Sequence, residues 1–247
     1  MKRYINHLFG MIIRVSILLI TGGGIAGILD LKERKQTHSR HICYGPYEKY
    51  LKRPLGFICG MLAVLVFWPL YLIIAIMVRL KLGSPMFFTQ ERPGRDEKIF
   101  KLYKFRTMTD ERDSNGNLLP DDVRLTRFGQ FLRRTSLDEL PEAYNIIKGD
   151  MSVIGPRPLL VRYLERYSDE QHRRHEVRPG LSGYAQVHGR NTVSWSDKFR
   201  MDLEYVDHVT FLGDVRIIWD SIIMAFIKKE GISSGTSATM EEFMGNE

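Results

Sequence analysis

The sequence is poor in cysteine and lacks the short motifs of several large enzyme classes. Its two cysteines, Cys43 and Cys59, form no C-x-x-C pair and stand at no zinc-ligand spacing. The chain contains no G-x-x-x-x-G-K-[ST] phosphate loop, no H-E-x-x-H metal motif and no internal repeat. These absences argue against a disulfide scaffold, a P-loop NTPase, a zinc metalloprotease and a repeat protein. A reduced protein that faces the cytoplasm is the simplest interpretation.

An excess of positive charge narrows the choice of partners. The 247 residues include 36 Lys and Arg against 29 Asp and Glu, which gives a formal net charge of +7. This balance favours nucleic acid, anionic lipid or a phosphorylated substrate, and charge alone does not choose among them. At this length the chain can bury one sizeable core, so we expect one domain with membrane-associated segments.

A long uncharged run predicts contact with a membrane. From Leu55 to Val78 there are 24 uncharged positions, which would form a helix of about 36 Å against a ~30 Å hydrocarbon core. Pro69 divides the run into two parts that are each too short to cross alone. Basic residues flank both ends of the run, with Lys49, Lys52 and Arg53 before it and Arg79 and Lys81 after it. Positive charge favours the cytoplasmic side, so both ends are expected there. The residues alone leave a kinked span and a broken, re-entrant hairpin open.

The first 44 residues have a different character. Leu8 to Leu29 is apolar except for Arg14, and the consecutive glycines Gly22 to Gly24 weaken any continuous helix. Residues 30–41 read as a solvated linker of mixed charge. The extension is either a second membrane anchor or a stretch added by a start codon upstream of the core, and the sequence leaves both open.

The rest of the chain predicts a compact, mostly α-helical domain with a small β element. Residues 85–90 and 99–107 are short, aromatic-rich runs separated by a turn at Arg92–Arg95, the pattern of two paired strands. Helical periodicity predicts helices at 123–134, 138–148, 158–166, 169–176, 196–207 and 213–228. The last helix is amphipathic, and it suits either the headgroup layer of a membrane or the domain core.

Two adjacent carboxylates, Asp138 and Glu139, are the strongest candidates for chemistry. They follow Arg133 and Arg134 and precede a helical pattern. A carboxylate at a helix N-terminus stays ionised, so it can ligate a cation or attack phosphorus. The same residues also fit a structural role, with Ser136 and Glu139 as an S-x-x-E capping box or with Asp138 as the N-cap.

Several basic residues have the chemistry to bind phosphate. Arg157 stands between two prolines that stiffen the backbone, and a guanidinium held in this way suits two-pronged phosphate binding. Lys104 and Arg106 are two apart on a predicted strand and therefore face the same side. The alternatives are a rigid surface loop for Arg157 and a solvated strand face for the other two.

Taken together, these motifs resemble those of the bacterial sugar transferase family, the monotopic phosphoglycosyl transferases. Members move a phosphosugar from a nucleotide diphosphosugar to a polyprenyl phosphate in the membrane. The resemblance runs from about Tyr47 to the C-terminus and includes a tail typical of the small, single-domain members. The matching segments are Phe88–Gly94, Tyr103–Met108, Leu137–Pro141, Asp150–Pro158, Arg178–Asn191 and Glu241–Gly245.

The resemblance implies an α+β protein whose compact domain sits on a Pro-broken, re-entrant membrane helix. The expected parts are an N-terminal extension at 1–44, the re-entrant helix at 45–83 and a cytoplasmic catalytic domain at 84–247 with a C-terminal interfacial helix. Trp68 stands before the proline where many relatives have serine, so a hydroxyl for the freed backbone groups is missing. The protein would lie in the bacterial cytoplasmic membrane, with its active site on the cytoplasmic face.

For the reaction, the resemblance makes Asp138 the nucleophile that carries a covalent phosphosugar, and Glu139 the second member of the dyad. Mg²⁺ is the implied cofactor, with Asp138 as a ligand. Arg157 matches the family's phosphate-site arginine, and the other expected substrate-binding residues are Lys104, Arg106, Arg134, Gln186 and Arg190. The donor would be a UDP-sugar and the acceptor undecaprenyl phosphate, giving UMP and undecaprenyl diphosphosugar as the first membrane step of a surface glycan.

Other partners and functions stay in competition at this point. Membrane lipid is an expected partner, nucleic acid is not, and a homodimer and contacts with downstream glycosyltransferases are left open. A membrane-anchored basic binding module would bind in a salt-dependent way and be indifferent to the dyad. A magnesium-dependent phosphodiesterase or nuclease would transfer to water and need no polyprenyl phosphate. The sequence does not name the sugar.

Overall fold

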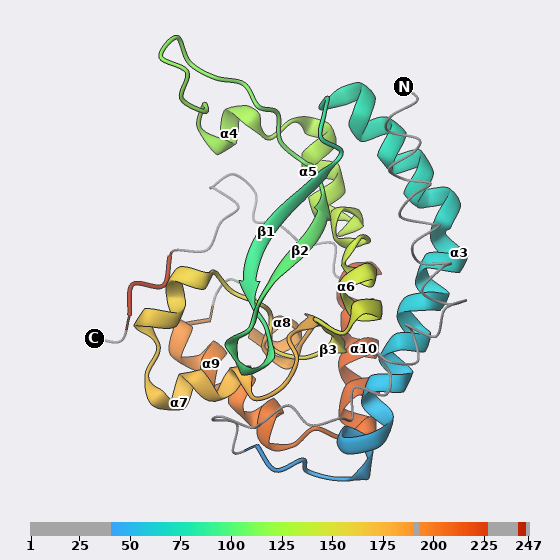
Figure 1. Ribbon diagram of the computed structural model, residues 1–247, viewed down its shortest axis with the longest axis vertical. Helices are drawn as coiled ribbons and strands as arrows, with labels where there is room; N and C mark the ends of the chain where they lie inside the picture. The colour runs from blue at the N-terminus through green and yellow to red at the C-terminus, as the bar shows by residue number, and fades with distance from the viewer. Residues whose placement is uncertain (1–40, 190–192, 227–241, 246–247) are drawn as a thin grey trace. The chain divides into compact units, whose positions relative to one another are not determined.

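The computed structural model describes residues 41–189, 193–226 and 242–245 (Figure 1). Its longest element is helix α3 (Lys52–Lys81), which lies along one side of a domain of short helices and two small sheets. The expected class, a mostly helical protein with a small β element, is confirmed. The predictions for Leu8–Leu29 and for the linker up to residue 40 lie outside the described residues.

Strands β1 (Phe87–Pro93) and β2 (Ile99–Phe105) form the antiparallel hairpin that the aromatic runs predict. The turn between them contains the 3-10 segment η2 (Arg95–Glu97). A second sheet is absent from the sequence prediction: β3 (Ser152–Ile154) and β4 (Gly180–Ser182) pair in parallel. Runs of three residues are too short to give a strand pattern in the sequence.

The rest of the described chain consists of short helical segments. In chain order they are η1 (Tyr47–Leu51), α4 (Asp121–Arg124), α5 (Arg127–Arg134), η3 (Leu137–Glu139), α6 (Glu142–Lys148), η4 (Val161–Arg166), α7 (Asp169–His172), η5 (Arg173–His175), α8 (Tyr184–Gly189), α9 (Trp195–Asp207) and α10 (Phe211–Phe226).

The helix predictions are right in place and often wrong in length. The predicted helix 123–134 divides because Thr126 caps α5, its side chain accepting a hydrogen bond from the amide of Gly129. The predicted helix 158–166 is a shorter 3-10 segment, and α8 lies where no helix was predicted. Residues 227 and 228 of the last predicted helix lie outside the described residues.

Helix α3 continues through Pro69. Together with η1 it is the one segment of the described chain, Tyr47–Lys81, that is long and apolar enough to cross a membrane by length and composition. The prediction of a helix broken at the proline is therefore wrong. A proline removes a single backbone hydrogen bond, and a 30-residue helix can absorb this loss as a bend. The re-entrant path through the membrane stays a prediction.

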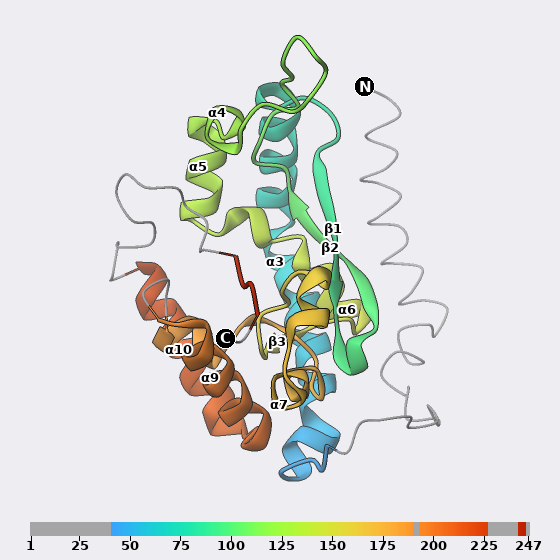
Figure 2. The ribbon, with the colours of Figure 1, turned by 90° about the vertical axis from the view of Figure 1, so that its left-hand side faces the viewer.

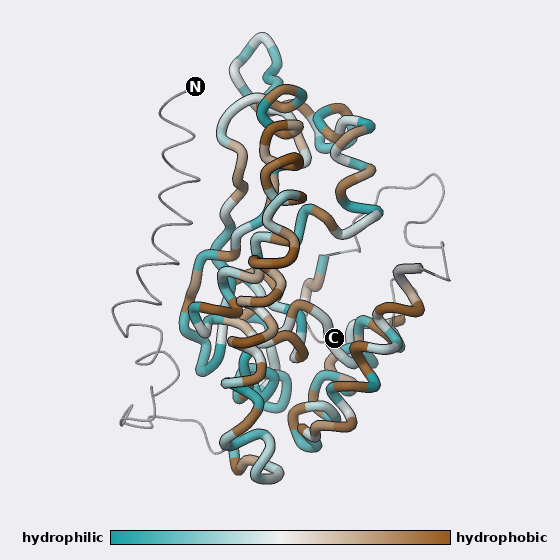
Figure 3. Tube along the Cα trace, turned by 90° about the vertical axis from the view of Figure 1, so that its right-hand side faces the viewer, coloured by the Kyte–Doolittle hydropathy of each residue, from teal (hydrophilic) through white to brown (hydrophobic). Residues whose placement is uncertain are grey.

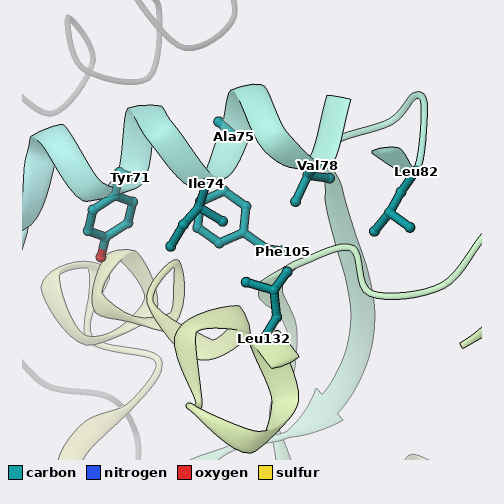
Figure 4. Close-up of a cluster of buried hydrophobic side chains, with 7 residues drawn as sticks. All are labelled: Tyr71, Ile74, Ala75, Val78, Leu82, Phe105 and Leu132. Atoms are coloured by element: carbon teal, nitrogen blue, oxygen red, sulfur yellow. The ribbon is translucent and has the colours of Figure 1, made fainter. Parts of the chain in front are cut away.

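Both faces of α3 are apolar, but only one is covered by the domain. Figure 3 shows hydrophobic residues along most of its length. The uncovered face includes Ile58, Leu62, Leu65, Val66, Trp68, Ile73, Ile76 and Leu80. The covered face forms a cluster with side chains of β2 and α5 (Figure 4): Tyr71, Ile74, Ala75, Val78, Leu82, Phe105 and Leu132. The domain therefore rests on one side of the membrane-type helix.

Helix α3 also fixes the end of α6. A Cβ on Gly60 would meet Ile147 at 3.0 Å and the carbonyl oxygen of Ala143 at 3.4 Å, so the two helices are in close contact. Arg53 donates from Nη1 to the carbonyl of Ile146 at 2.7 Å and from Nη2 to that of Ile147 at 2.8 Å. Both carbonyls belong to the last turn of α6, where the regular helical pattern of hydrogen bonds ends. The carbonyl of Ile146 also accepts from the amide of the C-cap residue Gly149 at 3.1 Å.

A buried polar network joins the start of α3 to α9 and α10, which lie side by side (Figure 2). Helix α8 packs against both of them. Asp214 of α10 binds Lys52 and accepts hydrogen bonds from the hydroxyls of Tyr47 at 2.6 Å and Tyr205 at 2.7 Å. The opposite face of α10 exposes apolar side chains: Phe211, Leu212, Val215, Ile218, Trp219 and Ile222.

Alanine substitution of two glycines tests the contact between α3 and α6. Gly60→Ala should be less stable than Gly56→Ala by about 1 kcal/mol, because a Cβ at Gly56 meets only Ile146, at 4.0 Å. Both substitutions gain the same helix propensity, so the difference in stability between the two variants reports the packing cost at Gly60. Thermal unfolding of the two variants in detergent measures it, and equal melting temperatures would contradict the close approach.

Cysteine labelling tests the path of α3 through the membrane. In a variant without Cys43 and Cys59, single cysteines placed at the exposed positions Lys49 and Lys81 should both react with an impermeant reagent from the same side of sealed vesicles. The reason is the basic residues at both ends of the helix. Reaction from opposite sides would show that α3 spans the membrane.

Candidate active site

The Asp138–Glu139 dyad lies in the short turn η3, between α5 and α6. Ser136 precedes this turn in a left-handed conformation (φ 53°), and its side chain makes no cap hydrogen bond. Helix α6 begins only at Glu142, after Pro141. The capping-box interpretation is therefore wrong, and Asp138 is not the N-cap of α6. A helix N-terminus, the predicted reason for an ionised Asp138, does not apply.

The turn is held against α3. The hydroxyl of Tyr71 donates to the carbonyl of Leu140, and Leu137 and Leu140 pack on the cluster drawn in Figure 4. In this position against α3, Asp138 is only 7% exposed. A carboxyl group is rarely buried to this degree unless it is paired or functional.

Glu139 is the centre of an ion cluster. Its Oε1 accepts hydrogen bonds from Lys104 Nζ at 2.6 Å and from Arg157 Nη2 at 2.9 Å. Lys104 Nζ also lies 3.1 Å from Oε1 of Glu142. Strand β2, turn η3, helix α6 and the turn after β3 therefore meet at one carboxylate. Two of the predicted substrate-binding residues, Lys104 and Arg157, therefore both contact the dyad.

The carboxyl groups of the cluster differ in acidity. Burial and the charge of Glu139 raise the pKa of Asp138 to about 6, although Lys104 and Arg133 oppose the shift. Burial and Glu139 also raise the pKa of Glu142. Burial also acts to raise the pKa of Glu139, but the positive charges of Arg157 and Lys104 outweigh this effect and lower the pKa. Glu139 is therefore a stable anion, whereas Asp138 changes its charge near pH 6.

The backbone of Arg157 is set by the pairing of β3 with β4. The amide of Gly155 donates to the carbonyl of Ser182 at 2.9 Å, and a Cβ on Gly155 would lie 2.3 Å from the carbonyl oxygen of Arg178. Only glycine fits this approach. Arg174 Nη2 donates to the carbonyl of Arg157 at 2.8 Å. The two motif segments around these strands, separate in the sequence, form one structural unit.

Lys104 and Arg106 have different surroundings. Lys104 contacts the carboxylates, whereas Arg106 is buried and donates to the carbonyls of Met108 at 2.6 Å and Ser84 at 2.8 Å. Its Nη2 also lies 2.7 Å from a carboxylate oxygen of Asp110. The expected common face is lost because β2 ends before Arg106. Its contacts are those of a residue that holds the loop after β2.

Of the remaining predicted residues, the two that the structure describes, Arg134 and Gln186, are not among the residues that bind the Glu139 carboxylate. Arg134 is exposed on the last turn of α5. Gln186 lies in α8, where its Nε2 is 3.4 Å from the carbonyl of Leu181 and its Oε1 is buried without a partner among the described residues. Arg190 lies outside the described residues.

Sequence analysis missed Arg92 and Glu142. Both line a pocket of about 70 Å³ beside the ion cluster, together with Leu102, Lys104, Arg157, Pro158 and Leu159. Burial and the charge of Arg157 lower the pKa of Arg92 to about 10. The spacing of four residues between Asp138 and Glu142 was a usable signal, because helical spacing would place both on one face. The only sequence signal for Arg92 was its position in the Phe88–Gly94 motif.

The donor atoms of the site fit the implied magnesium ion. Carboxylate oxygens are the ligands that Mg²⁺ prefers in proteins, and Asp138 and Glu142 both supply them. Their raised pKa values show that added positive charge would stabilise both anions. These two residues are the candidates for holding the ion.

A second group of potential ligands does not fit a metal. Ligand atoms of His41, Cys43 and Glu48 lie within 4.8 Å of one another. However, the ring nitrogens of His41 lie 2.6 Å from Glu48 and 3.4 Å from Glu176. The hydrogen bond to Glu48 raises the pKa of His41, despite its burial. Both ring nitrogens of His41 thus already lie beside carboxylates, so we assign no metal to this group.

Comparison with known proteins agrees with this geometry. The family model described as Bacterial sugar transferase matches residues 47–228. Sugar transferase EpsL of Bacillus subtilis, itself named as uncharacterised, is 54% identical over 169 residues, which cover 68% of this chain and 83% of EpsL. The undecaprenyl-phosphate galactose phosphotransferase of Salmonella typhimurium is 35% identical over 188 residues, 69% of this chain and 39% of that protein.

A third relative is the UDP-glucose:undecaprenyl-phosphate glucose-1-phosphate transferase of Xanthomonas campestris pv. campestris. It is 37% identical over 173 residues, 65% of this chain and 36% of that protein. The chain thus matches less than half the length of the two relatives with a named substrate, and most of EpsL. The family model covers the whole ion cluster and both strands of each sheet. The chain therefore belongs to the bacterial sugar transferase family.

Proposed function

We propose that the protein transfers a phosphosugar from a UDP-sugar to undecaprenyl phosphate, giving UMP and undecaprenyl diphosphosugar. The observation that carries the proposal is the buried Asp138 beside Glu139, whose carboxylate binds Lys104 and Arg157. The names of two relatives support the substrate class, because both include undecaprenyl phosphate as the acceptor. The reaction would be the first membrane step in the assembly of a surface polysaccharide or glycan.

The first step is a displacement at the sugar-linked phosphorus. An oxygen of ionised Asp138 forms a bond to this phosphorus, the phosphorus–oxygen bond to UMP breaks, and UMP leaves with the electron pair. Lys104 and the half-exposed Arg157 are the cations for the phosphate oxygens. Before the donor binds, Glu139 holds both cations in position.

The second step returns the carboxylate. An oxygen of undecaprenyl phosphate attacks the same phosphorus, and Asp138 leaves as the carboxylate. A general base is not needed, because a phosphate monoester with a second pKa of about 6 is largely dianionic at neutral pH. Mg²⁺, held by Asp138 and Glu142, would supply positive charge to the phosphate oxygens.

The exposed apolar surfaces support a lipid acceptor. We infer that α3, bent at Pro69, enters and leaves by the cytoplasmic face, since basic residues lie at both of its ends. We infer that α10 lies in the headgroup layer with Trp219 at the interface, since it exposes apolar side chains. Tyr71 ties the dyad segment to α3 at Leu140, so the nucleophile is connected directly to the membrane helix. A phosphate headgroup at the surface could then reach the site without leaving the bilayer.

Trapping the covalent intermediate tests the proposal. The protein incubated with a sugar-labelled UDP-sugar and no acceptor should retain label, and undecaprenyl phosphate should remove it. Asp138→Asn should retain none and should release no UMP, whereas Asp121→Asn, at a side chain that is 67% exposed, should behave like the natural protein. Repeated UMP release without acceptor would indicate a phosphodiesterase. Activity that requires both substrates at once, with no trapped label, would indicate direct transfer.

The pH dependence of the first step follows from the acidity of Asp138. Its pKa is raised to about 6, so the nucleophile is ionised above this pH and protonated below it. In a single turnover without acceptor, the rate of UMP release should therefore fall about tenfold per pH unit below the pKa of Asp138, which bound Mg²⁺ would lower from about 6. In Glu139→Gln this fall should begin at a lower pH, because the neighbouring negative charge that raises the pKa is removed. Identical pH–rate profiles for the natural protein and Glu139→Gln would contradict the assignment.

A further inference from the structure

The C-terminal segment Glu242–Gly245 has no part in the reaction proposed above, yet it is firmly bound. Phe243 is 2% exposed and lies in a cluster of aromatic side chains. Its ring centroid is 5.1 Å from that of Phe199, 5.5 Å from Trp195, 5.7 Å from Tyr163 and 5.8 Å from Tyr167. The phenyl ring therefore fills the space between α9 and η4.

Polar contacts hold the same segment to η4. The carboxylate of Glu242 lies 2.9 Å from Nε of Arg162 and 3.0 Å from Nη1 of Arg166. Arg166 also donates to the carbonyl of Phe243, and the amide of Phe243 donates to the hydroxyl of Tyr163 at 3.3 Å. Backbone and side chains of the tail are thus bound together, which a chance surface contact does not produce.

The surface that receives the tail is continuous with the backbone of Arg157. Tyr167, which packs against Phe243, accepts a hydrogen bond from Arg174 Nη1 at 3.4 Å. Arg174 is 3% exposed, binds Asp202 of α9 at 2.6 Å and donates to the carbonyl of Arg157 at 2.8 Å. The side chain of Arg157 in turn donates a hydrogen bond to Glu139 of the dyad. A continuous series of side-chain and backbone contacts therefore connects the tail to the active site.

We propose that the C-terminal segment Glu242–Met244 is a clamp that positions Arg157, with Phe243 as its anchor. Bound Phe243 fixes Tyr167 and Arg174 against α9, and Arg174 fixes the turn that aims the guanidinium of Arg157 at the phosphate site. Phe243 is a positioning residue, since it packs among the aromatic side chains of η4 and α9 and acts on the dyad only through Arg157. The inference rests on the proposed role of Arg157 in the transferase reaction.

A double-mutant cycle tests this inference, with UMP release from a UDP-sugar in membranes that contain undecaprenyl phosphate as the readout. Phe243→Ala should lower kcat/KM for the donor on the order of 10- to 100-fold, as misplacing a catalytic group does. Leu118→Ala, at a side chain that is 47% exposed in the loop before α4, should stay within about twofold of the natural protein, as expected for a surface substitution. Arg157→Lys should itself be strongly impaired, because lysine lacks the two-pronged guanidinium.

The decisive result is the effect of Phe243→Ala in the Arg157→Lys background. If the clamp acts through Arg157, the second substitution should cost little further activity there, although it lowers the melting temperature equally in both backgrounds. The same fold loss in both backgrounds, or full activity of Phe243→Ala, would overturn the inference. Absence of UMP release by the natural protein would instead refute the proposed function, so the two failures are distinguishable.

A peptide experiment covers the case in which these variants are too slow or too unstable. The chain truncated after Thr239 should have low activity, and a peptide of residues 236–247 should restore it. The same peptide with Phe243→Ala should not. A truncated enzyme as active as the full chain, or one that folds and is not restored by the natural peptide, would overturn the clamp.

Discussion

The Glu139 carboxylate is the group on which the arrangement of the site depends. It binds Lys104 from β2 and Arg157 from the turn after β3, so two cations from distant parts of the chain meet beside the nucleophile. Like-charged groups so close together would repel one another without an anion between them. Because the cations lower its pKa, Glu139 remains charged under all ordinary conditions and keeps them in place.

In the proposed mechanism, the same charge would make Asp138 a better nucleophile than an ordinary aspartate. Burial and the neighbouring Glu139 raise its pKa to about 6, which increases its basicity yet leaves it mostly ionised at neutral pH. A magnesium ion beside Asp138, or a phosphate bound by Lys104 and Arg157, would change the pKa of Asp138 when substrate binds. The two members of the dyad therefore have separate physical tasks: one is the reacting group, and the other sets its environment.

Helix α3 is both the membrane element and the foundation of the site. Tyr71 binds the backbone after the dyad, Arg53 binds the end of α6, and Gly60 permits the two helices to approach. Such contacts leave one face of α3 for the domain and the other for lipid. A lipid-bound acceptor and a soluble donor can thus reach one site at the boundary of the membrane.

The sequence by itself determined the features that depend on local pattern: the apolar run of α3, the β1–β2 hairpin, the approximate positions of the helices, and the motif residues Asp138, Glu139, Lys104 and Arg157. Tertiary structure alone decided the rest. Pro69 does not break α3, β3 and β4 pair although each has three residues, and Arg106 faces away from Lys104's carboxylates. Lys104 and Arg157 lie 35 and 18 residues from Glu139, so no local pattern could show that all three meet. The raised pKa of Asp138 likewise depends on tertiary structure, because its largest cause is burial.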